Sequence, residues 1–148
     1  MGSVRLAMVV GLVLVGATAS GCDERLSDIT GPTPDLQPTF SSIQKEILLS
    51  TAQTACSNCH NAVNARFAGN LDLSGDGAYA ALVNAASRNK AGAVRVVPGG
   101  PDNSYLIQKL EGRTGIFGLR MPQNGPPYLT EGQLLVIRKW ILDGAERN

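Results

Sequence analysis

The chain has 148 residues, of which 43% are hydrophobic and 17% charged, so its length suits one ordinary domain and its composition excludes a disordered or fibrous chain. Lys and Arg number 13 and Asp and Glu 12, and this formal charge of +1 argues against an electrostatic nucleic-acid binder. The chain also holds one His, three Cys and three Met. Because most metal and acid–base sites need more than one imidazole, much of the functional question depends on His60.

Residues 1–21 are predicted to be an export signal. Arg5 precedes a mostly apolar stretch over residues 6–19, which is short for a membrane-spanning helix of about 20 residues. The small residues Ala19-Ser20-Gly21 before Cys22 resemble the lipobox of bacterial lipoproteins. That resemblance implies cleavage before Cys22, lipidation of this cysteine, and anchoring to a bacterial membrane on its extracytoplasmic, periplasmic side. An ordinary signal peptide with a chance cysteine near its end is the alternative.

Residues 22–39 are predicted to be the lipid anchor and a flexible linker. The segment from Asp23 to Thr39 contains three Pro and one Gly and shows neither helical nor strand periodicity. We therefore expect one globular domain over residues 40–148.

The first half of this domain contains two predicted helices. Residues 40–50 place Phe40, Ile43, Ile47 and Leu48 on one helical face, and the spacing of Ser41 and Gln44 resembles a capping box. Residues 75–86 are predicted to form a second short helix, with Tyr79, Leu82 and Val83 on its apolar face.

The second half contains two more. A third helix is expected to be capped by Asp102 or Asn103, to run through about Leu110, and to end at Gly112. Thr130 and Gln133 form a capping-box pattern before a fourth helix, whose apolar face is formed by Leu134, Ile137, Trp140 and Ile141 and which Gly144 ends. The Gly- and Pro-rich segment between these helices, residues 112–130, is long for a loop in a compact domain, which points to a functional role.

Cys56-Ser57-Asn58-Cys59-His60 matches CxxCH, the attachment signature of c-type haem. Two thiols three residues apart at a helix end can each form a thioether to one vinyl group on one edge of a porphyrin. The adjacent imidazole is then directed at the iron. The only His and the only two Cys other than Cys22 fall within this motif. The export signal agrees, because c-type haem is attached outside the cytoplasm.

Paired cysteines also occur in zinc sites, redox motifs and disulfides. A structural zinc site needs four ligands, usually from two paired motifs, and the chain has no second CxxC and no second His. A thioredoxin-like CxxC expects a βαβ setting, whereas these flanks are helical and Gly-rich. A disulfide between Cys56 and Cys59 suits an oxidising compartment but leaves His60 without a role.

Met121 is the candidate for the second axial ligand of a haem iron. Once Met1 and Met8 leave with the signal, Met121 is the last methionine of the chain. It lies in the Gly- and Pro-rich segment, where a flexible thioether can reach an iron and Pro122 stiffens the backbone. The alternative is a methionine that only fills the core.

The domain resembles a small bacterial class I c-type cytochrome. The resemblance rests on three blocks in the same order, namely PGGPDNSYLIQKLEG at 98–112, MPQNGPPYLT at 121–130 and IRKWILDGA at 137–145. It implies an all-α fold wrapped around one covalent haem, in which the N- and C-terminal helices cross. It also implies axial ligation of the iron by His60 and Met121.

These features together predict a membrane-anchored, extracytoplasmic monohaem cytochrome c. We expect a monomer that carries single electrons between redox proteins, that is not an enzyme and that binds no nucleic acid. The alternative is a haem c domain with an open or displaceable axial site, acting as a sensor or enzyme subunit. The candidates for contacts with the haem propionates are Arg66, Arg95 and Arg120, and those for neighbours of the haem ring are Tyr105, Leu106 and Trp140.

Overall fold

The computed structural model describes residues 35–148, so the predicted signal peptide, Cys22 and most of the predicted linker lie outside the described residues. In chain order the helices are α2 (Phe40–Ile43), the π-helix η1 (Gln44–Leu48), the 3-10 helix η2 (Cys56–Asn58), α3 (Ala78–Leu82), the 3-10 helix η3 (Pro101–Asn103), α4 (Tyr105–Glu111) and α5 (Glu131–Leu142). In this part of the chain, β pairing consists of two isolated bridges, so the expected helical class is confirmed at the level of secondary structure. Over the same residues, no helix combines the length and apolarity needed to cross a membrane.

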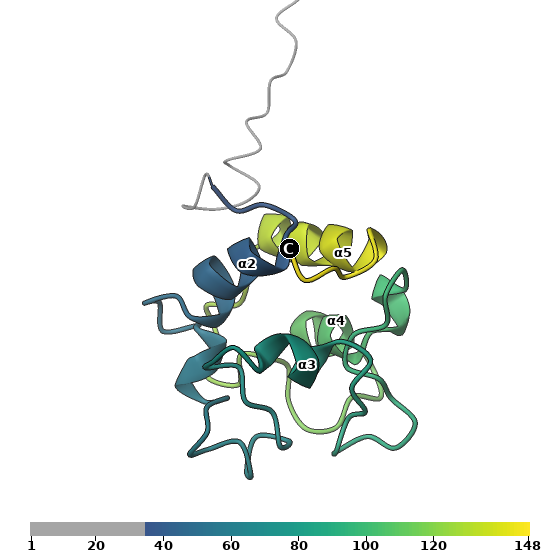
Figure 1. The fold of residues 1–148 in the computed structure, drawn as a ribbon. Coiled ribbons are helices and arrows are strands. Elements are labelled where there is room, and N and C mark those ends of the chain that lie inside the picture. The colour runs from purple at the N-terminus through teal and green to yellow at the C-terminus, as the bar shows by residue number, and fades with distance from the viewer. Residues whose placement is uncertain (1–34) are drawn as a thin grey trace, which may run out of the picture.

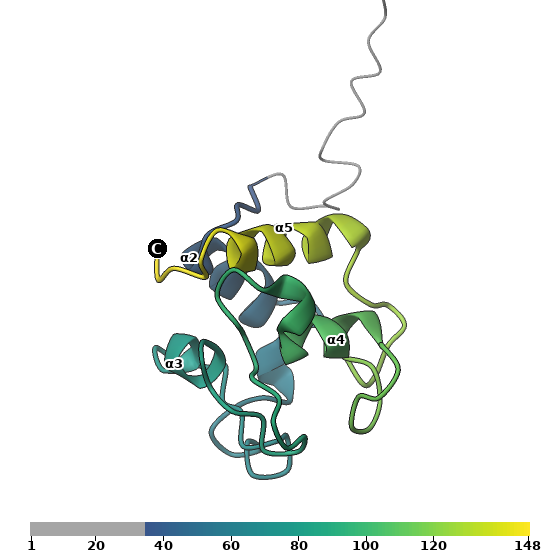
Figure 2. The same cartoon turned by 90° about the vertical axis from the view of Figure 1, so that its right-hand side faces the viewer.

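Helices α2 and α5 lie side by side at the top of the domain, with α3 and α4 below them (Figures 1 and 2). Trp140 of α5 is the largest fully buried side chain, and its ring centroid lies 5.7 Å from that of Phe40 in α2. The last residue, Asn148, accepts hydrogen bonds from the backbone N–H groups of Phe40 and Ser41, both at 2.9 Å. Both ends of the described chain therefore meet at α2.

The first helix runs from Phe40 to Leu48, as α2 followed by η1, close to the predicted 40–50. The four residues expected on its apolar face are all buried. Its cap differs from the prediction, because Thr39 Oγ1 accepts from the N–H of Ser42 at 3.3 Å while the Gln44 amide donates to the carbonyl of Gly75 at 3.2 Å. The core also begins before this helix, since Leu36, in the predicted linker, is only 5% exposed.

Helix α3 is much shorter than the 75–86 predicted for it. It ends at Leu82 because Val83 takes an extended conformation and pairs in parallel with Val96. Ala86 pairs with Val94 in an antiparallel bridge. Pairing with a segment about ten residues further along therefore replaces the last turns of the predicted helix.

Helix α4 begins at Tyr105, so Ser104 stands at the cap position, one or two residues later than predicted, since Asp102 and Asn103 belong to η3. The N–H groups of Tyr105 and Leu106 donate to the carbonyls of Val94 and Arg95, both at 2.9 Å. Backbone carbonyls thus accept hydrogen bonds from the first N–H groups of the helix, which a capping side chain would otherwise accept. The predicted end is confirmed, because Gly112 takes the left-handed conformation with φ +70°.

Helix α5 follows the prediction closely. Thr130 and Gln133 form the complete capping box, with the Gln133 N–H donating to Thr130 Oγ1 at 3.2 Å and the Thr130 N–H donating to Gln133 Oε1 at 2.9 Å. The predicted apolar face is directed inward, with Ile137, Trp140 and Ile141 buried.

Candidate functional site

The two cysteines and the histidine of the CxxCH motif share one tight turn. Cys56 begins η2, and its carbonyl accepts the N–H groups of Cys59 at 3.2 Å and of His60 at 2.8 Å. In a 3-10 turn, residues three apart are eclipsed, so the two cysteines lie on the same side of the turn. The His60 carbonyl accepts the N–H of Leu73 at 2.8 Å, which fixes the end of the turn to a later segment.

All four residues predicted to hold a haem line one cavity of about 580 Å³, namely Cys56, Cys59, His60 and Met121. Its size lies within the range typical of cofactor sites. The walls come from residues 53–73, from Leu82, from residues 87–95, from α4, and from residues 117–129. Helices α2 and α5 contribute no lining residue, so the aromatic core between them and the cavity are separate features.

The charged side chains of this cavity are all basic. Its lining contains no Asp or Glu, whereas Arg95 and Lys109 are both present. Burial lowers the pKa of His60, the nearby backbone of Leu71 and Ala68 opposes this shift, and the positive charges of Arg95 and Lys109 add to it. The imidazole is therefore held in its neutral form, which is the form that binds metals.

The Nδ1 atom of His60 is buried and has no hydrogen-bond partner among the described residues. Because Nδ1 is enclosed by protein, a ligand in the cavity would bind the other ring nitrogen, Nε2.

Both cysteines of the motif are free thiols in the described structure. Burial raises the pKa of the Cys56 thiol to about 11, so this group is protonated at neutral pH. Cys59 is exposed. One thiol is therefore partly enclosed by the cavity and the other lies on its open side.

Met121 is partly buried, packs against the hydrophobic core and also lines the cavity. Its N–H donates to the Lys109 carbonyl at 2.9 Å, which fixes the backbone of this loop residue to α4. Both roles predicted for Met121, as ligand and as core residue, are compatible with this position.

Of the three arginines proposed as propionate partners, only Arg95 lines the cavity. Arg66 lies over the ring of Phe67 with its Cζ at 4.5 Å, and Arg120 lies over the ring of Tyr128 with its Cζ at 4.0 Å. Among the expected haem neighbours, Tyr105 and Leu106 line the cavity. Trp140 does not, because its side chain packs against Phe40 of α2.

Sequence reasoning missed Lys109 and three large apolar residues of the lining. Lys109 lies one turn after Leu106 on α4, and this i, i+3 spacing was the available signal. Phe67, Phe117 and Leu119 line the cavity although each is at least 61% exposed. They belong to irregular segments, where no periodicity marks the direction of a side chain.

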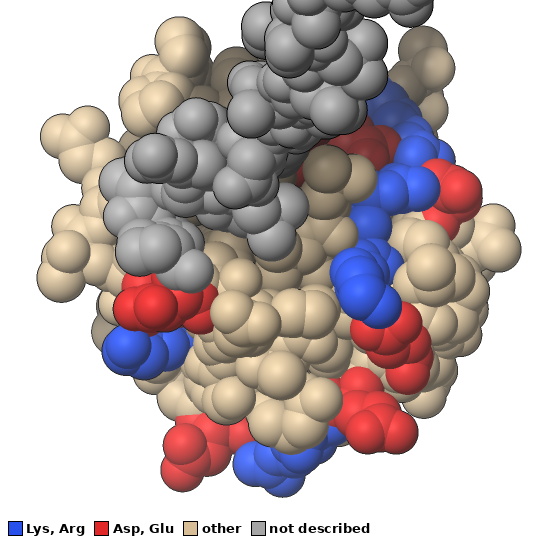
Figure 3. All heavy atoms as spheres, turned by 90° about the horizontal axis from the view of Figure 1, so that it is seen from above, with Lys and Arg blue, Asp and Glu red and all other residues tan. Residues whose placement is uncertain are grey.

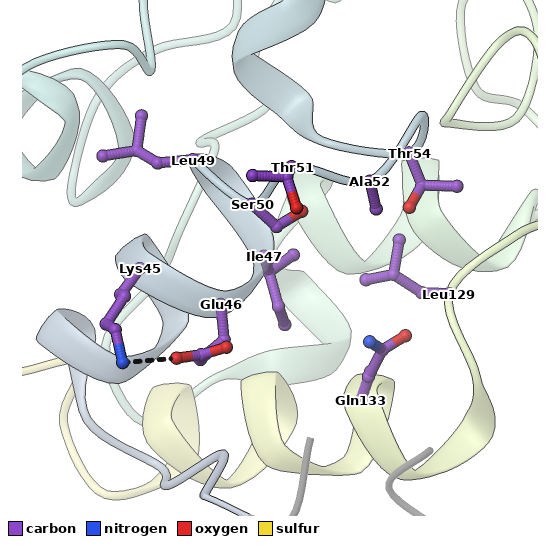
Figure 4. Close-up of a pocket in the computed structure, with 10 residues that line it drawn as sticks. All are labelled: Lys45, Glu46, Ile47, Leu49, Ser50, Thr51, Ala52, Thr54, Leu129 and Gln133. Carbon is purple, nitrogen blue, oxygen red and sulfur yellow. Dashed lines mark ion pairs between the residues drawn. The ribbon is translucent and has the colours of Figure 1, made fainter. Parts of the chain in front are cut away.

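A smaller cavity of about 370 Å³ lies between η1 and the start of α5 (Figure 4). Its lining includes Ser50, Thr51 and Thr54, whereas its larger polar groups are engaged within the protein. Lys45 pairs with Glu46 at 2.8 Å, and Gln133 belongs to the capping box of α5. None of the predicted site residues lines it.

Over residues 35–148, no three His, Cys, Asp or Glu side chains are grouped so as to hold a metal ion without further ligands. The iron of a haem takes its in-plane ligands from the macrocycle and only its axial ligands from the protein. The imidazole of His60 and the thioether of Met121 fit the requirement for axial ligands. The two thiols fit a different need, the attachment of the macrocycle.

No family model, curated protein or solved structure matches the chain. We therefore infer a function from the CxxCH residues, from Met121 and from the cavity that they line.

Proposed function

We propose that this protein is a membrane-anchored, extracytoplasmic monohaem cytochrome c that carries single electrons between redox proteins. The observation that carries the proposal is that Cys56, Cys59, His60 and Met121 line one cavity. They come from sequence segments about sixty residues apart, and each has the chemistry that covalent haem requires. The anchoring at Cys22 rests on the sequence of residues 1–22.

The two thiols would hold the cofactor covalently. Each thiol adds across a vinyl C=C bond, so that one C–S and one C–H bond form and no atom is lost. Cys56 and Cys59 share one side of their turn, which suits two attachment points on one edge of a porphyrin. His60 follows directly, and its Nε2 atom would serve as an axial ligand, because Nδ1 is enclosed by protein.

Arg95 is the residue best placed to bind the carboxylates of the haem. Its Nη1 donates to the Ala81 carbonyl at 2.8 Å, and its Nη2 donates to the carbonyls of Gly69 and Asn70 at 2.9 and 3.2 Å. Because a guanidinium has five N–H donors, these three bonds leave Nε and one Nη1 hydrogen available to another acceptor. The absence of acidic residues from the lining favours an anionic group there.

Bound haem supplies reversible one-electron exchange between ferric and ferrous iron. A thioether and an imidazole favour ferrous iron relative to two imidazoles, so Met121 and His60 would give a comparatively high reduction potential. The apolar side chains of the cavity would limit the contact of bound haem with water. This would also raise the reduction potential, because the ferrous haem carries less charge than the ferric haem.

Intact mass spectrometry of the full chain, expressed with a haem-attachment system, tests the proposal. We expect a mass gain of one haem, since addition of the thiols loses no atoms. The double variant Cys56→Ala/Cys59→Ala is the matched control and should gain none. An unmodified wild-type chain would refute the proposal and favour a partner-binding lipoprotein with a Cys56–Cys59 disulfide.

The same holoprotein tests the alternative of an open axial site. If Met121 binds the iron, the reduced protein should bind carbon monoxide poorly at neutral pH, and the oxidised protein should show the far-red absorption band of sulfur–iron ligation. Ready binding of carbon monoxide without that band would favour a sensor or enzyme subunit instead.

A further inference from the structure

The loop that carries Met121 is held by side chains and backbone of α4. We call residues 113–130 the ligand loop. Five hydrogen bonds join residues 117–121 of this loop to α4. They are Phe117 N–H to Tyr105 Oη at 2.8 Å, Lys109 Nζ to the Phe117 carbonyl at 2.8 Å, Lys109 Nζ to the Leu119 carbonyl, Arg120 Nε to the Leu110 carbonyl at 2.7 Å, and Met121 N–H to the Lys109 carbonyl at 2.9 Å.

Lys109 is the residue that contributes most to these bonds. Its ammonium group donates to two loop carbonyls, at Phe117 and Leu119, and its own carbonyl accepts the N–H of Met121. Charged donors form the stronger hydrogen bonds of proteins. Lys109 is partly buried, lines the cavity and forms none of the ion pairs found among the described residues, so its charge is directed to the ligand loop.

The ligand loop needs such bonds because its own backbone is irregular. The structure has no helix or strand between Glu111 and Glu131. Gly118, between the two carbonyls that Lys109 binds, takes a φ of +68°, a conformation that allows both carbonyls to turn toward one ammonium group. Without bonds from outside the loop, the position of the Met121 side chain would be poorly defined.

We propose that Lys109 is a positioning residue that holds the thioether of Met121 in the cavity. The inference rests on the proposed haem function. It assigns to Lys109 no contact with the iron, only the fixing of the loop that presents the sulfur.

The test compares Lys109→Leu with wild type in the full-length holoprotein. Lys109→Leu keeps an apolar side chain, removes the ammonium group and adds no second sulfur to the cavity. We expect haem to remain attached, the far-red band per haem to fall, and the fraction of reduced protein that binds carbon monoxide to rise roughly tenfold, as for the loss of a charged hydrogen bond. Lys109→Arg should restore most of the band. Lys139→Leu, which removes an exposed lysine of α5, should behave as wild type.

The outcomes separate the two proposals. A wild-type chain without haem overturns the proposed function, and an unchanged band in Met121→Ala overturns methionine ligation and with it the role of Lys109. A normal band in wild type and in Lys109→Leu overturns the role of Lys109 alone. Lys109→Gln is a second neutral variant in case Lys109→Leu does not fold. Loss of the fold in both neutral variants would make Lys109 a structural residue and would also overturn the proposal.

Discussion

His60 and Met121 contribute different chemistry to the same cavity. Burial keeps the imidazole of His60 neutral by lowering its pKa, and its Nδ1 atom has no partner among the described residues. Met121 has a flexible side chain on a backbone fixed by one hydrogen bond to Lys109. The imidazole is thus positioned by a tight turn, whereas the thioether depends on the hydrogen bonds that hold its loop.

The substitution Met121→Ala separates the proposed binding of iron by Met121 from the proposed covalent attachment of the haem. If the chain carries haem as proposed, we expect the haem to stay bound, because the proposed attachment at Cys56 and Cys59 and the proposed ligand His60 are untouched. The reduction potential should fall by on the order of 100 mV, since axial ligands strongly tune the potential of haem iron. Spectroelectrochemical titration measures this change. Leu135→Ala, which changes an exposed residue of α5 that does not line the cavity, is the control, and equal potentials in wild type and Met121→Ala would show that Met121 is not a ligand.

At the scale of elements, an ion-pair network joins η3, α4 and α5. Arg113 contacts Asp102 at 2.7 Å and Glu111 at 2.6 Å, and Arg138 of α5 contacts the same two carboxylates at 2.8 and 3.0 Å. Acidic and basic side chains also lie close to one another on the face that carries α5 (Figure 3). Because α4 holds the ligand loop, this network indirectly supports the cavity as well.

The network predicts a pH dependence of stability. Hydrogen bonds from Arg113 and Arg138 lower the pKa of Asp102 below its ordinary value of 3.8. The folded state therefore gains stability from this carboxylate above pH 3.8, and the gain is lost as the pH falls through the lower folded pKa. Asp102→Asn should lose less stability on acidification than wild type.

Urea unfolding at a series of pH values from neutrality to below 3.8 measures this effect. Asp76→Asn, which removes an exposed carboxylate outside this network, is the matched control. Parallel pH profiles for wild type and Asp102→Asn would contradict the assignment.

At the scale of the whole molecule, an aromatic cluster joins the first and last helices with α3. Phe40 contacts both Trp140 and Tyr79, with ring centroids 5.7 and 5.1 Å apart. The Trp140 Nε1–H donates to the Glu146 carbonyl and the Tyr79 hydroxyl to the Ala145 carbonyl, both at 2.9 Å. The C-terminal segment is thereby fixed against three helices, away from the cavity.

Trp140→Ala should therefore affect stability without affecting the haem site. We expect a loss of about 3–5 kcal/mol in the free energy of unfolding, because Trp140 is only 1% exposed and its removal leaves a cavity. Denaturant unfolding of the holoprotein measures the loss, and Trp140→Phe should lose less. The visible spectrum of the folded variant should be unchanged, so an altered haem spectrum would show that the core and the cavity are coupled.

Local patterns predicted the parts of the fold that depend on neighbours in sequence. The apolar faces of the helices over 40–48 and 131–142, the capping box at Thr130 and the end of α4 at Gly112 all follow from contacts within a few residues. The CxxCH turn is equally local, so its chemistry could be predicted from spacing.

Long-range contacts determined the features of the fold that local sequence patterns did not predict. Pairing of Val83 with Val96 ended α3 early, Leu36 entered the core from the predicted linker, and Lys109 bound carbonyls of a loop that has no periodicity. The gathering of Met121 and Arg95 around the CxxCH turn is of the same kind. The physical reason is that sequence spacing specifies which side chains share a face or a turn, whereas a cavity wall joins segments whose proximity arises only when the whole chain packs.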